Sequence, residues 1–108
     1  MLLQNITDES RTRPASEREM EKELIRELHG GEVYEYYPLG EHIVSAIGVC
    51  DGRPTFKGTR IEAAGALNLI AAGYTIAQIA QRFEVPHPAV KEAIRLAAAR
   101  LDDLKIAA

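Results

Sequence analysis

The sequence predicts a mainly α fold, in which an N-terminal helix and a β-hairpin precede a trihelical domain that ends in a helix-turn-helix. From Ile61 onward, apolar residues recur at spacings of three and four, which is the pattern of amphipathic helices. The hydrophobic fraction is 46% while the aromatic fraction is only 6%, and alanine is frequent, which favours closely packed helices over a large β core. Ahead of these helices, strand formers flank a Pro-Leu-Gly-Glu turn.

The length and charge of the chain limit its class. Its 108 residues provide one modest core and an appendage, and we divide them into an N-terminal extension, 1–47, and a helix-turn-helix domain, 48–108. The net charge of −3 hides an asymmetry, because residues 1–52 carry eleven acids and five bases whereas residues 53–108 carry five acids and eight bases. An acidic N-terminal half and a basic C-terminal half indicate two surfaces with different partners.

A reducing, cytoplasmic location is expected. Cys50 is the single cysteine, so no disulfide can form within the chain. No apolar stretch approaches the ~20 residues that a membrane-spanning helix needs, and the first ten residues lack both the basic start and the apolar core of a signal peptide.

The N-terminal helix is expected to run from Ser16 to the Gly30-Gly31 stop. Ser16 and Glu19 have the spacing of a capping box, and paired glycines favour the left-handed end of a helix. Residues 1–14 are polar and lack periodicity, so we expect them to be mobile or to depend on a partner for order. The helix carries a narrow apolar stripe over a charged remainder, which indicates a partner-binding element: Met20, Leu24, Ile25 and Leu28.

The hairpin is expected at about 33–37 and 42–48. A lone two-stranded ribbon is marginal in water and leaves both edges unpaired, so the sequence favours a homodimer joined partly through this hairpin. The candidate contacts are Tyr36, Val44 and Ile47. The alternative is that the N-terminal helix folds back and covers the hairpin within one chain.

Three helices are expected after the hairpin. Thr59 and Glu62 have the spacing of a capping box for the first, which ends at Gly73, and Thr75 and Gln78 have the same spacing for the second. The third follows Pro86, with Pro88 at its start, where a missing amide costs nothing. Its residues Val90, Ile94, Ala97 and Leu101 are expected to share one face.

The stretch Gly52-Arg53-Pro54-Thr55-Phe56-Lys57-Gly58-Thr59-Arg60 concentrates three cations just ahead of the first of these helices. A phosphate-binding P-loop would place its lysine after the last glycine, beside a serine or threonine, whereas Lys57 precedes Gly58. The cations Arg53, Lys57 and Arg60 are therefore candidates for nucleic-acid contact, and a solvated cationic loop is the alternative.

The second and third helices form the expected helix-turn-helix. Ile79 and Ala80 pack inward, and the small residue lets the two helices cross closely. Glu84 occupies the turn position where glycine is usual. The third helix is expected to present Ala89, Lys91, Glu92 and Arg95 outward. There Lys91 and Arg95 can contact phosphate or guanine, and Glu92 can accept from cytosine but repels the phosphate backbone. Alternatively, Glu92 neutralises Arg95 and the face is only solvated. The full set of candidate DNA contacts is Arg53, Lys57, Arg60, His87, Lys91, Glu92 and Arg95.

The cationic stretch and the segment after it also resemble a known family. The run Gly52-Arg53-Pro54-Thr55-Phe56-Lys57-Gly58-Thr59-Arg60-Ile61, followed by Gly73-Tyr74-Thr75 with Ile79 and Phe83, is similar to the signature of domain of unknown function 433. The resemblance covers about residues 48–101. It implies a homeodomain-like fold and a VapB-type antitoxin that partners a PIN-like ribonuclease toxin. The chain departs from the family at Glu62, where many members have proline, and in its long acidic N-terminal segment.

No catalytic constellation is evident. His29, His42 and His87 are scattered without the spacing of a zinc site, and Asp102-Asp103 lack a partner carboxylate for two-metal chemistry. We expect no enzyme, cofactor or metal. The sequence thus favours a cytoplasmic, homodimeric antitoxin-like regulator that binds a PIN-like nuclease and double-stranded DNA. The alternatives are a protein-interaction module without DNA binding and, less favoured, a nucleic-acid-processing enzyme.

Overall fold

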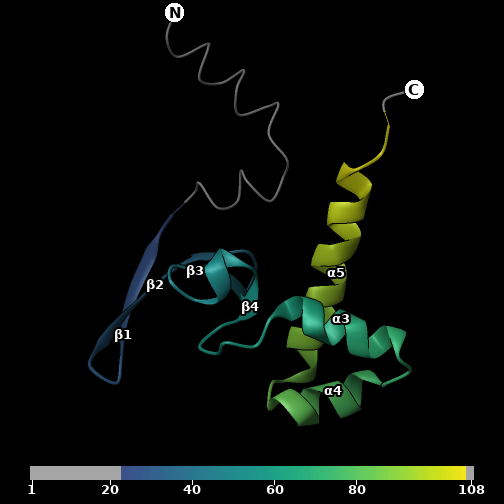
Figure 1. The fold of residues 1–108 in the computed structure, drawn as a ribbon, viewed down its shortest axis with the longest axis horizontal. Coiled ribbons are helices and arrows are strands. Elements are labelled where there is room, and N and C mark those ends of the chain that lie inside the picture. The colour runs from purple at the N-terminus through teal and green to yellow at the C-terminus, as the bar shows by residue number, and fades with distance from the viewer. Residues whose placement is uncertain (1–22, 107–108) are drawn as a thin grey trace, which may run out of the picture.

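The computed structural model describes residues 23–106, which form an antiparallel sheet and a group of helices (Figure 1). The sheet has four strands in the order β1-β2-β3-β4, a simple meander. The expected mainly α fold is therefore wrong, because a four-stranded sheet stands beside the three helices. The elements are β1 (Ile25–His29), β2 (Glu32–Pro38), β3 (Ile43–Ala46), the 3-10 turn η1 (Cys50–Gly52), β4 (Thr55–Phe56), α3 (Ala63–Ala71), α4 (Ile76–Phe83) and α5 (His87–Asp103).

Strand β1 stands where the sequence pattern predicted the end of the N-terminal helix, so that prediction is wrong for Ile25–His29. Gly30 and Gly31 both have positive φ, 58° and 85°, which is what a two-residue hairpin turn between right-twisted strands requires. Cross-strand charge pairing supports the hairpin, since Arg26 lies opposite Glu35 and forms a salt bridge with it. The proposed cap at Ser16 and Glu19 lies outside the described residues.

The second hairpin confirms its prediction. Strands β2 and β3 pair antiparallel around the Pro-Leu-Gly-Glu segment, with Tyr36 opposite Ala46 and Pro38 opposite Val44. All four residues of β3 are buried, because β4 pairs along its other edge and side chains from both faces enter the core.

The helices begin and end largely at the expected residues. Thr75 caps α4 with its side chain, which accepts from the Gln78 amide at 3.1 Å, while the Gln78 side chain accepts from the Thr75 amide at 2.8 Å. The capping box expected at Thr59 and Glu62 is wrong. Helix α3 begins two residues later than expected, after Glu62, whose backbone is extended and pairs with Thr55 of the sheet.

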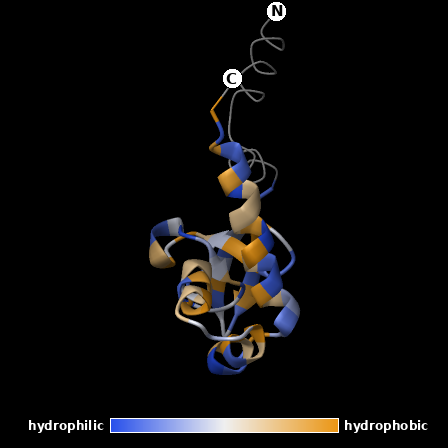
Figure 2. Cartoon of the chain, turned by 90° about the vertical axis from the view of Figure 1, so that its right-hand side faces the viewer, coloured by the Kyte–Doolittle hydropathy of each residue, from blue (hydrophilic) through white to orange (hydrophobic). Residues whose placement is uncertain are grey.

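Two clusters form the interior. The larger joins the sheet to the helices, and the smaller lies on the other face of β3, where Tyr36, Val44 and Ala46 are buried. Ile43, Phe56, Ile79 and Val90 are the largest side chains at the centre of the first cluster. The C-terminal end of α5 rises clear of the other described elements and carries exposed apolar residues (Figures 1 and 2). None of the helices within residues 23–106 is long and apolar enough to cross a bilayer.

Candidate nucleic-acid interface

Helices α4 and α5 meet in a tight helix-turn-helix. Glu84 ends α4 in the left-handed region, with φ 58° and ψ 45°, and the Val85 amide donates to the Ala80 carbonyl at 3.0 Å. This is the geometry that glycine usually provides, and here an acidic residue adopts it. Ala80 is buried at the crossing together with Ala89, so the two helices approach closely. The turn expected from the sequence is confirmed.

The outward placement of Glu92 and Ala89 is wrong. Both are buried, Ala89 at 1% and Glu92 at 8% exposure. The Glu92 carboxylate accepts hydrogen bonds from three backbone amides, those of Glu41 at 2.9 Å and His42 at 2.7 Å in the loop after β2, and that of Ile43 at 2.9 Å at the start of β3. Gly40 belongs to the same contact, since a Cβ built there would lie 2.6 Å from a Glu92 oxygen. Glu92 therefore fastens α5 to the sheet.

The burial of Glu92 leaves the outer face of the N-terminal half of α5 basic. His87, Lys91 and Arg95 are exposed and follow one another at intervals of four, so they lie along one stripe of the helix. Among residues 23–106, neither Lys91 nor Arg95 forms a salt bridge. Three of the predicted DNA contacts are thus brought together on the N-terminal half of α5, where no acidic side chain is exposed.

The cation of Arg53 is engaged within the chain. Its Nε donates to the Glu62 carboxylate at 2.9 Å, and Asp51 lies 3.6 Å away from its guanidinium. This hydrogen bond to the Glu62 carboxylate raises the pKa of Arg53 above its ordinary value. Arg53 thus stabilises the start of α3 through Glu62, the residue at which this chain departs from the resembled signature.

The cation of Lys57 is engaged as well. Its Nζ lies 5.2 Å from the centre of the Tyr36 ring and 3.5 Å from the Glu27 carboxylate. The neighbouring Tyr36 side chain, followed by the Glu27 carboxylate, raises the pKa of Lys57. Next along the loop, the Gly58 amide donates to the Tyr34 hydroxyl at 2.9 Å, so this part of the loop is anchored to the first hairpin. Arg60 is exposed, while its carbonyl accepts from the Cys50 thiol at 3.3 Å.

Arg82 was missed by the sequence reasoning. It is exposed in the last turn of α4, next to the turn that leads into α5, and its guanidinium lies 5.9 Å from the centre of the Tyr74 ring. A basic residue at the end of the first helix of a helix-turn-helix was the signal that could have found it, because this end lies near the exposed start of the second helix.

The residues expected to bind partners are scattered. Met20 lies outside the described residues, Ile25 packs against the smaller core cluster, and Leu28 is 75% exposed. Leu24 is half-buried. Of the expected dimer contacts, Tyr36 and Val44 are buried within the chain, whereas Ile47 is 54% exposed.

The comparisons with known proteins give one match. Residues 43–97 match the model of a family described as "Protein of unknown function (DUF433)". The matched segment begins at β3 and includes the loop cations, the whole of α3 and α4 and the stripe of α5. No curated protein and no solved structure matches the chain.

Proposed function

Because the chain belongs to the DUF433 family of proteins of unknown function, and the match includes its helix-turn-helix, we propose that it is a non-enzymatic, antitoxin-like regulator that binds duplex DNA and a PIN-like nuclease. The DNA-binding surface is the stripe of His87, Lys91 and Arg95 on α5, with Arg82 beside it. The observation that carries this proposal is the burial of Glu92, which removes the one acid of the N-terminal half of α5 from its outer face.

The physical reason is electrostatic. A carboxylate on a recognition helix repels the phosphate backbone, whereas exposed lysine and arginine neutralise it and release counterions. Lys91 and Arg95 are one turn apart and repel each other mildly on a free helix, and a phosphate relieves that repulsion. Arg53 and Lys57 are left out of the proposed surface because each has an acidic partner within the chain.

The first test measures binding to the DNA upstream of the protein's own coding region over a series of salt concentrations. The variant Lys91→Ala with Arg95→Ala should bind more weakly and should lower the slope of log K against log salt by about two units. The control is Arg26→Ala with Lys105→Ala, which removes the same charge from exposed positions elsewhere. Binding that is insensitive to salt, or equal losses in both variants, would contradict the assignment.

The nuclease-binding part of the proposal is supported by the first hairpin. Leu28 and Val33 lie opposite each other across β1 and β2 and are 75% and 64% exposed, so they form an apolar pair on a sheet whose outer strand is β1. An exposed strand edge beside an apolar pair suits a partner that adds a strand or covers the hairpin.

Its test is capture of the product of the neighbouring gene after co-expression. Leu28→Asp with Val33→Asp should abolish capture, whereas the control Ile47→Asp, also at an exposed apolar residue of the sheet region, should leave it intact. Capture that survives the first variant would place the contact elsewhere. Failure to bind DNA with intact capture would favour the protein-interaction module.

A further inference from the structure

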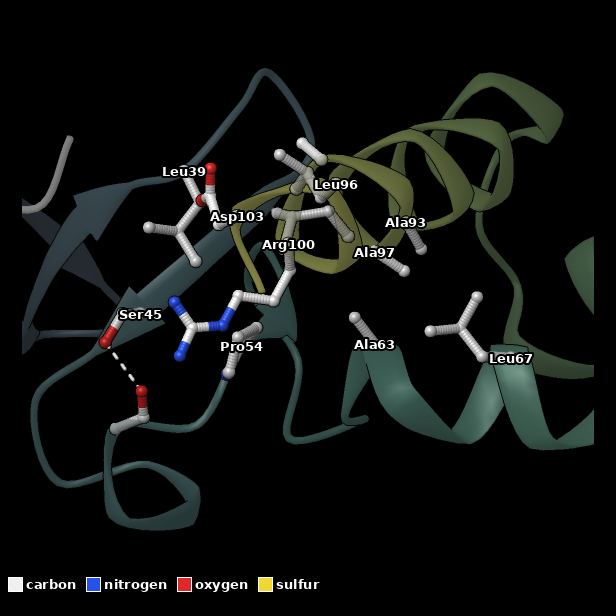
Figure 3. A pocket seen from close by; sticks show the side chains of 13 residues that line it. Leu39, Ser45, Pro54, Ala63, Leu67, Ala93, Leu96, Ala97, Arg100 and Asp103 are labelled. Atoms are coloured by element: carbon white, nitrogen blue, oxygen red, sulfur yellow. Dashed lines mark hydrogen bonds between the residues drawn. The ribbon is translucent and has the colours of Figure 1, made fainter. Parts of the chain in front are cut away.

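An apolar groove of about 580 Å³ lies alongside the C-terminal half of α5 (Figure 3). The side facing α5 includes Leu39, Pro54 and Leu67, from the loop after β2, the segment before β4, and α3. Ala93, Leu96 and Ala97 form the α5 side. Arg100 and Asp103 are its charged residues, and both extend from α5.

The α5 wall continues beyond the groove. Ala93, Ala97, Leu101 and Leu104 follow one another at spacings of four, four and three, so they lie on one face of the helix. Ala93 and Ala97 line the groove, but Leu101 is 70% exposed and Leu104 is 61% exposed. Ile106, just after the helix, is 90% exposed. The chain thus carries an apolar groove and, next to it, an uncovered apolar helix end.

We propose that a second copy of this chain occupies the groove, with the two α5 helices crossing antiparallel about a two-fold axis close to Arg100. Leu104 of each copy then lies opposite Ala97 of the other, and each copy inserts its uncovered helix end into the groove of its partner. A two-fold axis requires one surface to complement itself, and a groove beside a matching projection meets that requirement. The small side chains of Ala93 and Ala97 leave room for the incoming leucines.

The charges at the groove fit the same arrangement. In an antiparallel crossing at Arg100, the guanidinium of one copy comes within about one helical turn, roughly 5 Å along the axis, of Asp103 of the other. The two-fold axis forms this pair twice. Within the described part of one chain, neither Arg100 nor Asp103 takes part in a salt bridge.

This interface differs from the hairpin interface expected from the sequence. Tyr36 and Val44 are already buried inside one chain, so they are not available to a second copy without unfolding the sheet. The α5 surface needs no such change. The inference does not depend on DNA binding, since it uses the opposite half of α5.

The first test is sedimentation of the full chain at micromolar concentration. The wild type should sediment at about twice the 11.9 kDa of one chain, and Leu101→Asp with Leu104→Asp should sediment as one chain. Both leucines are exposed, so the variant should keep its helical circular dichroism. The control is Leu28→Asp with Val33→Asp, which should remain dimeric. A wild type that sediments as one chain would overturn the proposal. The occupant of the groove would then have to be residues 1–22 or a different protein.

The second test fixes the geometry. Arg100→Glu should weaken the dimer about tenfold or more, and adding Asp103→Arg should restore it. In a Cys50→Ser background, Ala97→Cys with Leu104→Cys should form a disulfide-linked dimer. The two cysteines of one helix are about 10 Å apart along the axis, beyond the reach of a disulfide, so the link must join two copies. A dimer that is unaffected by the charge changes and forms no such link would exclude this crossing.

Discussion

At the scale of single residues, Glu92 makes the contact that joins α5 to the segment between β2 and β3. On a helical wheel it falls beside Lys91 and Arg95, so the sequence alone predicts that it is exposed on the surface. The direction of its side chain is set by a distant segment, residues 41–43, whose backbone amides all donate to the carboxylate. Buried backbone donors need acceptors, and no local pattern shows which residue fifty positions away supplies them. The role of Glu92 therefore could not be predicted from the sequence.

Glu92→Ala should destabilise the fold by about 3 kcal/mol, because it removes the charged acceptor of three backbone amides, of which that of Ile43 is buried and the other two are part-buried. Glu92→Gln keeps one acceptor oxygen but loses the charge, and should cost about half as much. Urea denaturation measures both, with the exposed neighbour Lys91→Ala as control, which should change stability by less than about 0.5 kcal/mol. If Glu92→Ala matches the Lys91→Ala control, the carboxylate does not hold the loop.

At the scale of elements, a sequence pattern predicted the structure correctly where all the residues of the interaction belong to the same helix or strand. The cap of α4 needs only Thr75 and Gln78, three residues apart, and it forms as expected. Residues 25–29 offered no such self-contained signal. Their spacing suits a helix, but pairing with β2 gives Arg26 and Glu27 partners that a lone helix would lack. Short apolar patterns leave helix and strand undecided, and long-range pairing decides between them.

The first hairpin should also respond to acid. The Glu27 carboxylate accepts from the Tyr36 hydroxyl at 2.7 Å, and this bond together with that from His29 lowers the pKa of Glu27 below its ordinary value of 4.5. Because the folded pKa is the lower one, this contribution to stability is present above pH 4.5 and is lost as pH falls through the folded pKa.

Amide signals of β1 and β2 in NMR spectra should therefore lose dispersion as the pH falls below 4.5, before those of the helices. In Glu27→Gln this pH dependence should be reduced, with Glu32→Gln at the hairpin tip as the matched control. If the hairpin amides of Glu27→Gln titrate as in the wild type, another carboxylate is responsible.

At the scale of the whole molecule, the two ends of α5 have separate proposed roles, and their spacing links the roles. Lys91 lies nine to ten residues from the proposed crossing at Arg100, so an antiparallel pair of α5 helices puts the two Lys91 side chains roughly 30 Å apart. Half-sites on duplex DNA lie about 34 Å apart, one turn of the double helix. Measured along α5, the separation of the two stripes is therefore close to one turn of the duplex, and the stripes lie on the sides of the two helices that face away from the dimer contact.

Footprinting on the upstream DNA checks this link. The wild type should protect two regions whose centres lie about one turn apart, because each copy contacts one half-site. Leu101→Asp with Leu104→Asp leaves each stripe intact but separates the copies, so it should keep a weak, salt-sensitive affinity and lose the paired footprint, since a single module reads too few bases for tight binding. Lys91→Ala with Arg95→Ala should do the reverse, remaining dimeric while losing both protected regions. A paired footprint that persists in the leucine variant would show that the two copies meet through another surface, and the distance between the stripes would then no longer follow from the length of α5.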